Sequence, residues 1–373
     1  MSVDFNLPER PRILVITLRR LGDTLLTTPL VRTLRRGFPQ ATIDMLVFSG
    51  GDRILQGNPD IDNVIAVPRR LSVRQTIALA SRLWRRYDLA ISTQAGDRLT
   101  FLAMLASRRR IGLVPRRGET GAWWKSWVYD CPVPAEPSNH RVDELLRLAA
   151  VLGLGGRSDI VCPQESLGTA VAPPKPYAVL HANPMYRYKQ WTGAGWRALA
   201  QALVARGLTL IATGGPDVGE RSYLDALWGT DDSLVKRLDG QLDWPQLAAL
   251  LAGAAVYIGP DTSMTHLAAG TGCPTVALFG PTDPRLWGPW PVGGLEQLWA
   301  AAGTIQHRGN VWLVQHALPC TPCQKEGCEH HLDSHSQCLD ELPVHRVLAA
   351  VDQALAWSRG QESGRRLGDT GSQ

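Results

Sequence analysis

The sequence lacks any long uninterrupted apolar run: no window of about 18 apolar residues occurs in its 373 residues, so no membrane-spanning helix is predicted. The first ten residues also lack the apolar core of a signal peptide. With 44% apolar and 20% charged residues, the composition is that of an ordinary soluble globular protein. We therefore expect a cytoplasmic protein with enough chain for two domains.

The dinucleotide-binding fingerprint Gly-x-Gly-x-x-Gly is absent after the first predicted strand, residues 12–18. The segment that follows, Arg19 to Thr24, holds a single glycine, Gly22, which lets the chain turn tightly. Asp23 lies at the predicted strand-to-helix junction, where a carboxylate can accept a proton from a hydroxyl nucleophile. The alternative is that Asp23 only caps the following helix.

Acidic residues are scarce in the first half of the chain. Residues 1–172 hold 24 Lys and Arg against 16 Asp and Glu, a net charge of +8, whereas residues 173–373 hold 15 against 18, a net charge of −3. Most of the excess is arginine, whose planar fork suits phosphate and carboxylate. The asymmetry predicts an anionic partner: a membrane surface, a phosphorylated glycan or a nucleic acid. For any single Arg pair, a solvated charged face is the better explanation of the charge.

Strand-like apolar runs alternate with amphipathic helical patterns in the first half, which predicts a parallel sheet covered on both faces. The predicted strands are 12–18, 42–48, 63–67, 88–92 and 110–114, and the predicted helices are 25–38, 73–87, 99–106 and 142–152. Pro29 suits the first position of the first helix, with Thr28 as its cap; the alternative is a helix that kinks at Pro29.

A Gly- and Pro-rich linker at 153–176 precedes a second alternating half. Its predicted strands are 177–181, 208–212, 254–258 and 275–279, and its predicted helices are 195–206, 220–227, 244–251, a short one after Asp261 and a last one at 344–357. The predicted fold is α/β, with two doubly wound domains at 1–172 and 173–343 that leave a cleft between them. We expect a C-terminal helix at 344–358 that packs back toward the first domain, and a disordered tail at 359–373.

The segment from 254 to 279 predicts a strand, a polar turn, a short helix and a second strand. Asp261, Thr262 and Ser263 fill the turn and supply capping side chains and backbone N–H groups at the positive end of the helix. That arrangement suits a phosphate at the carboxyl end of a strand. The alternative is a plain capped helix with no ligand.

Two other strand ends carry candidate residues. Arg187 and Lys189 follow the strand at 177–181, where a cation can neutralise a diphosphate leaving group, and Trp191 can wall the site. The alternative is surface charge beside a packing tryptophan. After the strand at 208–212, Gly214 and Gly215 let a flat base or ribose lie close to the backbone. Glu220 can accept hydrogen bonds from ribose hydroxyls, or it belongs to an ordinary helix start.

Four of the seven cysteines, Cys320, Cys323, Cys328 and Cys338, form a Cys-x2-Cys-x4-Cys-x9-Cys loop at 319–339. The four thiols could bind zinc or an iron–sulfur cluster, although the spacing is not a standard one for structural zinc, or they form a loop of reduced thiols. A disulfide is not expected in the cytoplasm. The 13 tryptophans suit sugar stacking, a membrane interface or a buried core.

Taken in order, these segments resemble the lipopolysaccharide heptosyltransferases, glycosyltransferase family 9. Residues 13–30 resemble the amino-terminal motif of that family, and 57–65 resemble a further stretch. The motifs around Lys189, at 213–216, at 261–269 and at 277–284 complete the resemblance, which covers about 12–357. The Cys-rich loop is similar to that of the heptosyltransferase III-like subset.

The resemblance implies a GT-B fold with two Rossmann-like domains, the acceptor site in the first and the nucleotide-sugar site in the second. It implies an inverting transfer of heptose from ADP-heptose to a lipopolysaccharide inner-core acceptor, without a metal or other cofactor and without nucleic acid. The basic first half then fits peripheral contact with the anionic inner face of the inner membrane.

Roles implied by the resemblance fall on matching positions. Asp23 is the general base and Lys189 meets the diphosphate. Thr262, Ser263 and Met264 offer N–H groups, Asp261 and His266 shape that turn, and Arg187, Gly214, Gly215 and Glu220 complete the donor site. Arg19, Arg20 and Gly22 belong to the acceptor side.

One departure from the family pattern is Ser263, which stands where the family often has glycine. Two other functions stay open: a GT-B nucleotide-sugar epimerase or hydrolase, which needs several acidic residues around the sugar, and a non-catalytic glycan-binding member.

Overall fold

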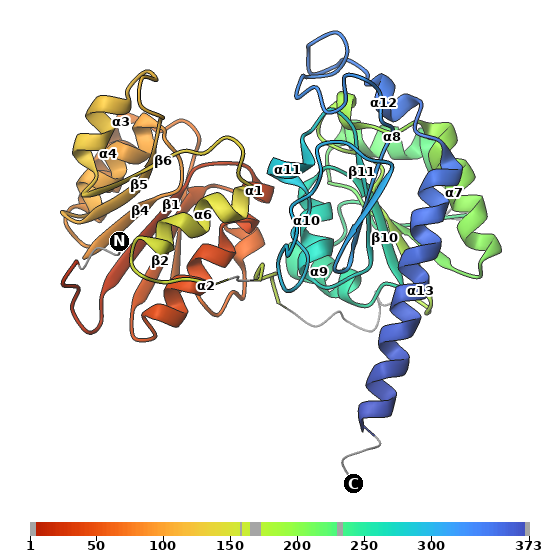
Figure 1. The fold of residues 1–373 in the computed structure, drawn as a ribbon, viewed down its shortest axis with the longest axis horizontal. Helices are drawn as coiled ribbons and strands as arrows, with labels where there is room; N and C mark the ends of the chain where they lie inside the picture. Colours follow the sequence, from red (N-terminus) through yellow and green to blue (C-terminus); the bar gives the residue numbers. More distant parts are fainter. Residues whose placement is uncertain (1–4, 157–158, 165–172, 230–233, 370–373) are drawn as a thin grey trace. The chain divides into compact units, whose positions relative to one another are not determined.

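The computed structural model describes residues 5–156, 159–164, 173–229 and 234–369. They belong to two compact units that divide after Pro163, inside the predicted linker (Figure 1). No helix among the described residues is long and apolar enough to cross a membrane.

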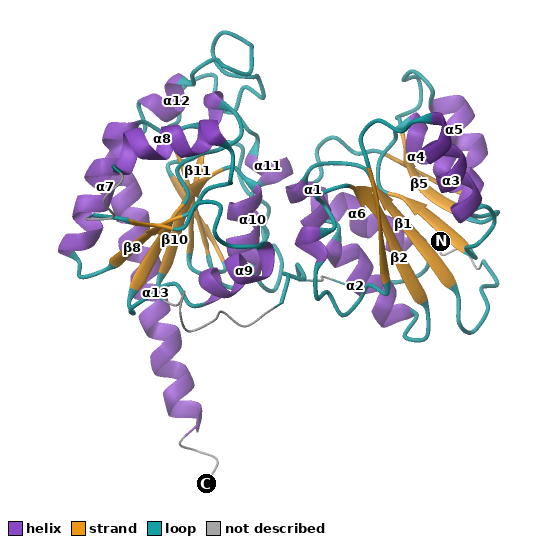
Figure 2. Cartoon of the chain, turned by 180° about the vertical axis from the view of Figure 1, so that it is seen from behind, coloured by secondary structure: helices purple, strands orange, loops and turns teal. Residues whose placement is uncertain are grey.

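The first unit is a six-stranded sheet in the order β3-β2-β1-β4-β5-β6, and every neighbouring pair is parallel. Its elements are β1 (Arg12–Thr17), α1 (Leu21–Leu25), α2 (Thr28–Gly37), β2 (Thr42–Phe48), η1 (Arg53–Leu55), β3 (Asn63–Val67), α3 (Val73–Leu83), β4 (Leu89–Ser92), α4 (Asp97–Ala106), β5 (Arg110–Val114), α5 (Ala122–Val128), β6 (Cys131–Pro134) and α6 (Arg141–Ala150). Helices α2 and α6 lie together on one face of the sheet, and α3, α4 and α5 lie on the other (Figure 2). Because helices cover both faces, β1 is buried from Ile13 onward.

The predicted helix at 25–38 corresponds to α2, and a short helix that was not predicted, α1, precedes it. The hydroxyls of Thr27 and Thr28 bond back to the α1 carbonyl oxygens of Asp23 and Leu25, at 2.8 and 2.7 Å, and so close the first helix before the second begins. The N-cap of α2 is therefore Thr27 rather than Thr28, and its side chain makes no capping hydrogen bond. Gly22 lies inside α1 instead of forming a tight turn of its own.

The second unit is a seven-stranded sheet in the order β12-β13-β11-β10-β7-β8-β9, parallel except for the antiparallel β12 edge. Its elements are β7 (Tyr177–Leu180), η2 (Arg187–Lys189), α7 (Gly193–Ala205), β8 (Thr209–Ala212), α8 (Val218–Trp228), β9 (Lys236–Arg237), α9 (Trp244–Ala252), β10 (Val256–Pro260), α10 (Ser263–Gly270), β11 (Thr275–Phe279), α11 (Pro284–Trp287), β12 (Ile305–Arg308), β13 (Val311–Gln315), α12 (Gln337–Asp340) and α13 (Val344–Asp369). Side chains of α7, α8 and α13 share one core with the sheet.

Helix α13 packs within the second unit and is longer than predicted. Val347, Ala350, Val351 and Ala354 are fully buried in the core of the second unit. The apolar stripe of this helix is therefore used within its own unit, and the expectation that the helix packs back toward the first domain stays a prediction. The helix extends to Asp369, beyond the predicted end at Trp357 and into the segment expected to be disordered, of which 370–373 lie outside the described residues.

Candidate functional site

Asp23 lies in the first turn of α1, directly after the carboxyl end of β1. Its carboxylate is 12% exposed and has two guanidinium groups beside one oxygen, Oδ1: Arg19 Nη1 at 3.3 Å and Arg141 Nε at 4.0 Å. The other oxygen, Oδ2, accepts no hydrogen bond from the described residues. One oxygen of this carboxylate is therefore flanked by positive charge while the other is available to accept a proton.

Arg141 is the residue of this site that sequence reasoning missed. It begins α6, where His140 Nδ1 caps the helix by accepting from Val142 N, and its side chain reaches the carboxyl edge of the sheet to donate to Thr93 O at 3.0 Å. Its Nε is buried and makes no hydrogen bond within the described chain. Burial lowers the pKa of Arg141 to about 10, although Asp23 opposes the shift, so the guanidinium still carries its charge at neutral pH.

The predicted acceptor-side residues stand next to Asp23. Arg19 and Arg20 form the connection from β1 to α1 and are both exposed. The backbone of Arg20 fixes the start of α1, since its carbonyl oxygen accepts from Thr24 N at 3.0 Å and from Thr24 Oγ1 at 3.1 Å. The structure therefore brings Arg19, Arg20 and Asp23 to one sheet edge and adds Arg141 to them.

In the second unit, Asp261 and Lys189 form a buried ion pair. Lys189 Nζ lies 2.5 Å from Asp261 Oδ2, and His266 Nε2 lies 4.0 Å from Asp261 Oδ1. Burial raises the pKa of the Asp261 carboxyl, but Lys189 and His266, together with a hydrogen bond from Thr282, outweigh it and hold that pKa below its usual value. Because both oxygens face cationic or donor groups, Asp261 organises this turn and is not placed to act as a base.

The turn between β10 and α10 leaves the helix start without a side-chain cap. Thr262 is the N-cap residue, yet its side chain makes no capping hydrogen bond. The first bond that closes the helix runs from His266 N to Thr262 O at 3.3 Å, so the N–H groups of Ser263 and Met264 precede the intrahelical ladder. The side chain of Thr262 therefore does not cap the helix, and the positive end of α10 keeps N–H groups that can meet an anion.

The turn after β8 is held by its own side chains. Glu220 Oε2 accepts from Gly215 N at 2.6 Å, and Asp217 rather than Glu220 caps α8. A Cβ on Gly215 would lie 2.6 Å from that Glu220 oxygen, and a Cβ on Gly214 would lie 2.6 Å from Leu224 Cδ1. A side chain at either glycine would therefore have to displace the end of the Glu220 or the Leu224 side chain.

Two charged residues and one tryptophan after β7 were predicted to belong to the site, and the structure places them differently. Arg187 is exposed in η2, and its charge acts on Asp340 of α12. Lys189 lies 5.9 Å from the centre of the Tyr188 ring. Trp191, by contrast, does not wall the site: it is 2% exposed, donates to Leu342 O at 2.9 Å and packs edge-on against Trp196. The alternative of a packing tryptophan is therefore correct.

The Cys-rich loop packs beside this site. Gln324 N donates to Pro281 O at 2.8 Å, and Ser336 Oγ donates to Tyr188 O at 2.6 Å. All four cysteines are free, and burial, with a smaller contribution from the neighbouring thiols, raises the pKa of Cys338 to about 12. Among the described residues, no group of three or more His, Cys, Asp or Glu side chains is arranged to hold a metal ion.

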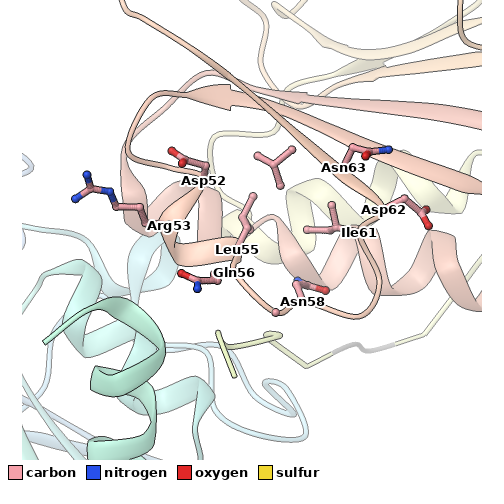
Figure 3. A pocket seen from close by; sticks show the side chains of 10 residues that line it. Asp52, Arg53, Leu55, Gln56, Asn58, Ile61, Asp62 and Asn63 are labelled. Atoms are coloured by element: carbon pink, nitrogen blue, oxygen red, sulfur yellow. The ribbon is translucent and has the colours of Figure 1, made fainter. Parts of the chain in front are cut away.

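A hollow of about 450 Å³ lies between the β2–β3 connection and the start of β3 (Figure 3). Asp52, Arg53 and Gln56 line one part of it, and Asn58, Asp62 and Asn63 line the rest. None of the residues assigned to the site from the sequence lines this hollow.

Two doubly wound α/β units, each built on a mostly parallel sheet, are the architecture of GT-B glycosyltransferases, and solved structures of that fold match this chain. The chain is similar to E. coli heptosyltransferase WaaC with ADP (TM-score 0.68, 20% identity, 92% of this chain and 99% of that one). It is also similar to E. coli ADP-heptose lps heptosyltransferase II (TM-score 0.70, 18% identity, 93% and 99%). These likenesses confirm the predicted fold.

Sequence comparison identifies the family. The family model described as glycosyltransferase family 9 (heptosyltransferase) matches residues 76–329, well over half of the chain. Lipopolysaccharide heptosyltransferase 3 of Escherichia coli (strain K12) is 26% identical over 355 residues, which cover 91% of this chain and 96% of that protein. The chain belongs to glycosyltransferase family 9, the heptosyltransferases, as its motifs predicted.

Proposed function

We propose that this glycosyltransferase moves a heptose from ADP-heptose to the inner core of lipopolysaccharide, by a single displacement that inverts the configuration of the sugar. Relatives along nearly the whole chain are named lipopolysaccharide heptosyltransferases, and WaaC has been solved with ADP and with ADP-2-deoxy-2-fluoro heptose. The second unit receives the donor and the first unit receives the acceptor.

The donor diphosphate binds at the start of α10 in this proposal. Ser263 and Met264 supply N–H groups at the positive helix end, and Lys189 supplies the charge that stabilises the leaving ADP. Asp261 keeps Lys189 in place before the donor arrives. These groups meet the electrostatic demand of the leaving group, so we propose that transfer requires no metal ion at the reaction centre.

The remaining donor contacts surround that position. Arg187 adds a second, exposed cation two residues before Lys189. Gly214, Gly215 and Glu220 form the turn for the nucleoside, and the Glu220 carboxylate, now bonded to Gly215 N, exchanges that bond for a ribose hydroxyl.

The observation that carries the proposal is the Asp23 carboxylate, with Oδ1 flanked by Arg19 and Arg141 and Oδ2 accepting nothing from the described residues. In the reaction Oδ2 of Asp23 takes the proton of the acceptor hydroxyl. At the same time the hydroxyl oxygen forms its bond to the anomeric carbon of the heptose, and the bond from that carbon to ADP breaks. Arg19 and Arg20 suit an acceptor that carries phosphates and carboxylates. We place the enzyme at the cytoplasmic face of the inner membrane, in peripheral contact with anionic lipid.

The test is a panel of nucleotide-sugars combined with core-oligosaccharide acceptors, with nucleotide release and acceptor mass measured together. We expect heptose transfer from ADP-heptose, with the inverted anomeric configuration in the product's NMR spectrum and with full activity in EDTA. Nucleotide release without any gain in acceptor mass would point to a hydrolase or epimerase instead, and transfer of another sugar in preference to heptose would contradict the donor assignment.

A further inference from the structure

Three consecutive helices of the first unit expose large apolar side chains on their outer surface. Among the described residues, six such side chains that are more than half exposed lie on α3, α4 and α5 or at their ends, and we call them the α3–α5 patch: Val73 (76%), Ile77 (64%), Trp84 (61%), Phe101 (55%), Trp123 (74%) and Trp127 (87%). Single exposed apolar residues are normal, but three tryptophans and three other apolar residues on adjacent helices are not.

Helix α3 has two separate apolar stripes. Leu79 and Leu83 are buried and attach the helix to its unit, whereas Val73 and Ile77, one turn apart, are exposed on another side. Most residues of the helix are exposed. A helix that meets only its own core needs one apolar stripe, so the second stripe indicates an apolar surrounding outside the unit.

The patch continues across the neighbouring helices. The rings of Phe101 on α4 and Trp124 on α5 lie 5.6 Å apart, and Trp123 and Trp127 stand one turn apart on α5. Figure 2 shows α3, α4 and α5 together on one face of the sheet. The exposed side chains therefore belong to one layer of the unit.

Positive charge surrounds these residues. Residues 73–130, which include the three helices, hold 11 Lys and Arg against 4 Asp and Glu, a net charge of +7 that exceeds the +5 of the whole chain. Arg74, Arg82, Arg85 and Arg86 are exposed on and after α3, and Arg116 and Arg117 are exposed just before α5. The guanidinium of Arg85 lies 5.6 Å from the centre of the Trp84 ring.

We propose that the α3–α5 patch docks on an anionic lipid bilayer, with the tryptophans at the headgroup boundary and the arginines on the lipid phosphates. Exposed Trp and aliphatic residues ringed by arginine are the composition of an interfacial membrane surface, and the excess charge matches anionic lipid.

The position of the patch suits the proposed function, on which this inference rests. Lys125, between Trp123 and Trp127 on α5, donates to Ala95 O at 2.7 Å, at the carboxyl end of β4. Strand β4 pairs with β1, whose carboxyl end leads to Asp23. A lipid-anchored acceptor can thus stay in the bilayer under α5 while its sugar reaches the acceptor edge of the same unit.

The test is sedimentation of the full-length protein with vesicles of phosphatidylcholine alone or with about 30 mol% phosphatidylglycerol. We expect binding to the anionic vesicles, weakened by added salt, and a loss of at least about tenfold in partition coefficient for the double variant Trp123→Ser/Trp127→Ser. The matched control is Val218→Ser/Leu298→Ser, two exposed apolar residues of the second unit (77% and 52%), which should bind like the wild type.

Three results would overturn the proposal: no binding of the wild type to anionic vesicles, equal binding by the tryptophan variant, or an equal loss in the control. If instead the wild type self-associates in analytical ultracentrifugation and the tryptophan variant does not, without vesicle binding, the patch joins two copies of the chain. Transfer to a soluble, deacylated acceptor should be unchanged in the tryptophan variant. If the wild type transferred no sugar to this soluble acceptor, the proposed function would be contradicted, whereas the measurement of vesicle binding would remain valid.

Discussion

The Lys189–Asp261 pair gives the sharpest test of the second-unit site. Replacing Lys189 with Met leaves the Asp261 carboxylate, 9% exposed, without its cation, while His266 remains 4.0 Å away. Breaking a buried pair typically costs 3–5 kcal/mol. Because the Lys189 side chain is 20% exposed, we expect Lys189→Met to lower the free energy of unfolding by about 3 kcal/mol, the low end of that range.

The double variant Lys189→Met/Asp261→Asn removes both charges, so it should recover most of that loss. We expect a coupling energy of about 2 kcal/mol between the two positions. The pH dependence follows from the same physics. Without Lys189, burial becomes the main influence on Asp261 and its pKa in the folded state rises. A raised folded pKa means stability that is lost as pH rises, so Lys189→Met should be destabilised more at pH 7 than at pH 4.5.

Urea unfolding followed by the fluorescence of the buried tryptophans of the second unit measures all four proteins of the cycle. Lys236→Met is the matched control, since Lys236 is exposed on β9 and should change stability by less than about 0.5 kcal/mol. Additive costs, with a coupling below about 0.5 kcal/mol, would refute the pair as the element that organises this turn.

Three further predictions follow from the geometry. Arg141→Met should lower kcat by at least about tenfold and displace the acidic limb of the kcat–pH profile, whereas Arg141→Lys should restore part of the rate; an unchanged profile would exclude a positioning role. Burial lowers the pKa of His181 to about 4, so this side chain stays neutral in the folded protein while the unfolded chain is protonated below about pH 6.5. The free energy of unfolding should therefore fall by about 3 kcal/mol as the pH drops from 6.5 to 4, and His181→Gln should reduce this pH dependence. Gly215→Ala should displace the Glu220 carboxylate and cost about 1–2 kcal/mol, whereas Gly155→Ala, with nothing within 4 Å of the new Cβ, should cost little.

The fold was predictable because parallel strands buried on both faces read as continuous apolar runs. Nine predicted strands match β1–β5, β7, β8, β10 and β11 within about two residues. The elements that were not predicted have weaker sequence patterns. Strand β6 is Cys-Pro-Val-Pro, and the short helix α5 contains three tryptophans and shows no clear helical period. The tail of α13 was missed because its sequence lacks the apolar period on which the prediction relied.

Site residues were predictable where a charged side chain follows soon after the carboxyl end of a predicted strand, as for Asp23, Lys189 and Asp261. Arg141 could not be found in this way, since it reaches the sheet edge from the start of α6 and belongs to no motif. The environment of each tryptophan was also not predictable. Trp290, Trp299 and Trp312 near the Cys-rich loop are core residues, whereas the exposed ones lie in the first unit. Composition gives the number of tryptophans, but only packing shows which of them face solvent.

The most direct test of the account is the rate of heptose transfer by Asp23→Asn at saturating ADP-heptose, measured beside Asp52→Asn and with the affinity of each protein for ADP. Asp52 lines the hollow of the first unit, and among the described residues its carboxylate accepts a hydrogen bond from Gly50 N alone, so it is the matched carboxylate. We predict that Asp23→Asn lowers kcat by about 10²–10⁴-fold and leaves ADP affinity within a few-fold, while Asp52→Asn changes neither. Transfer by Asp23→Asn at the wild-type rate would contradict the assignment of Asp23 as the base.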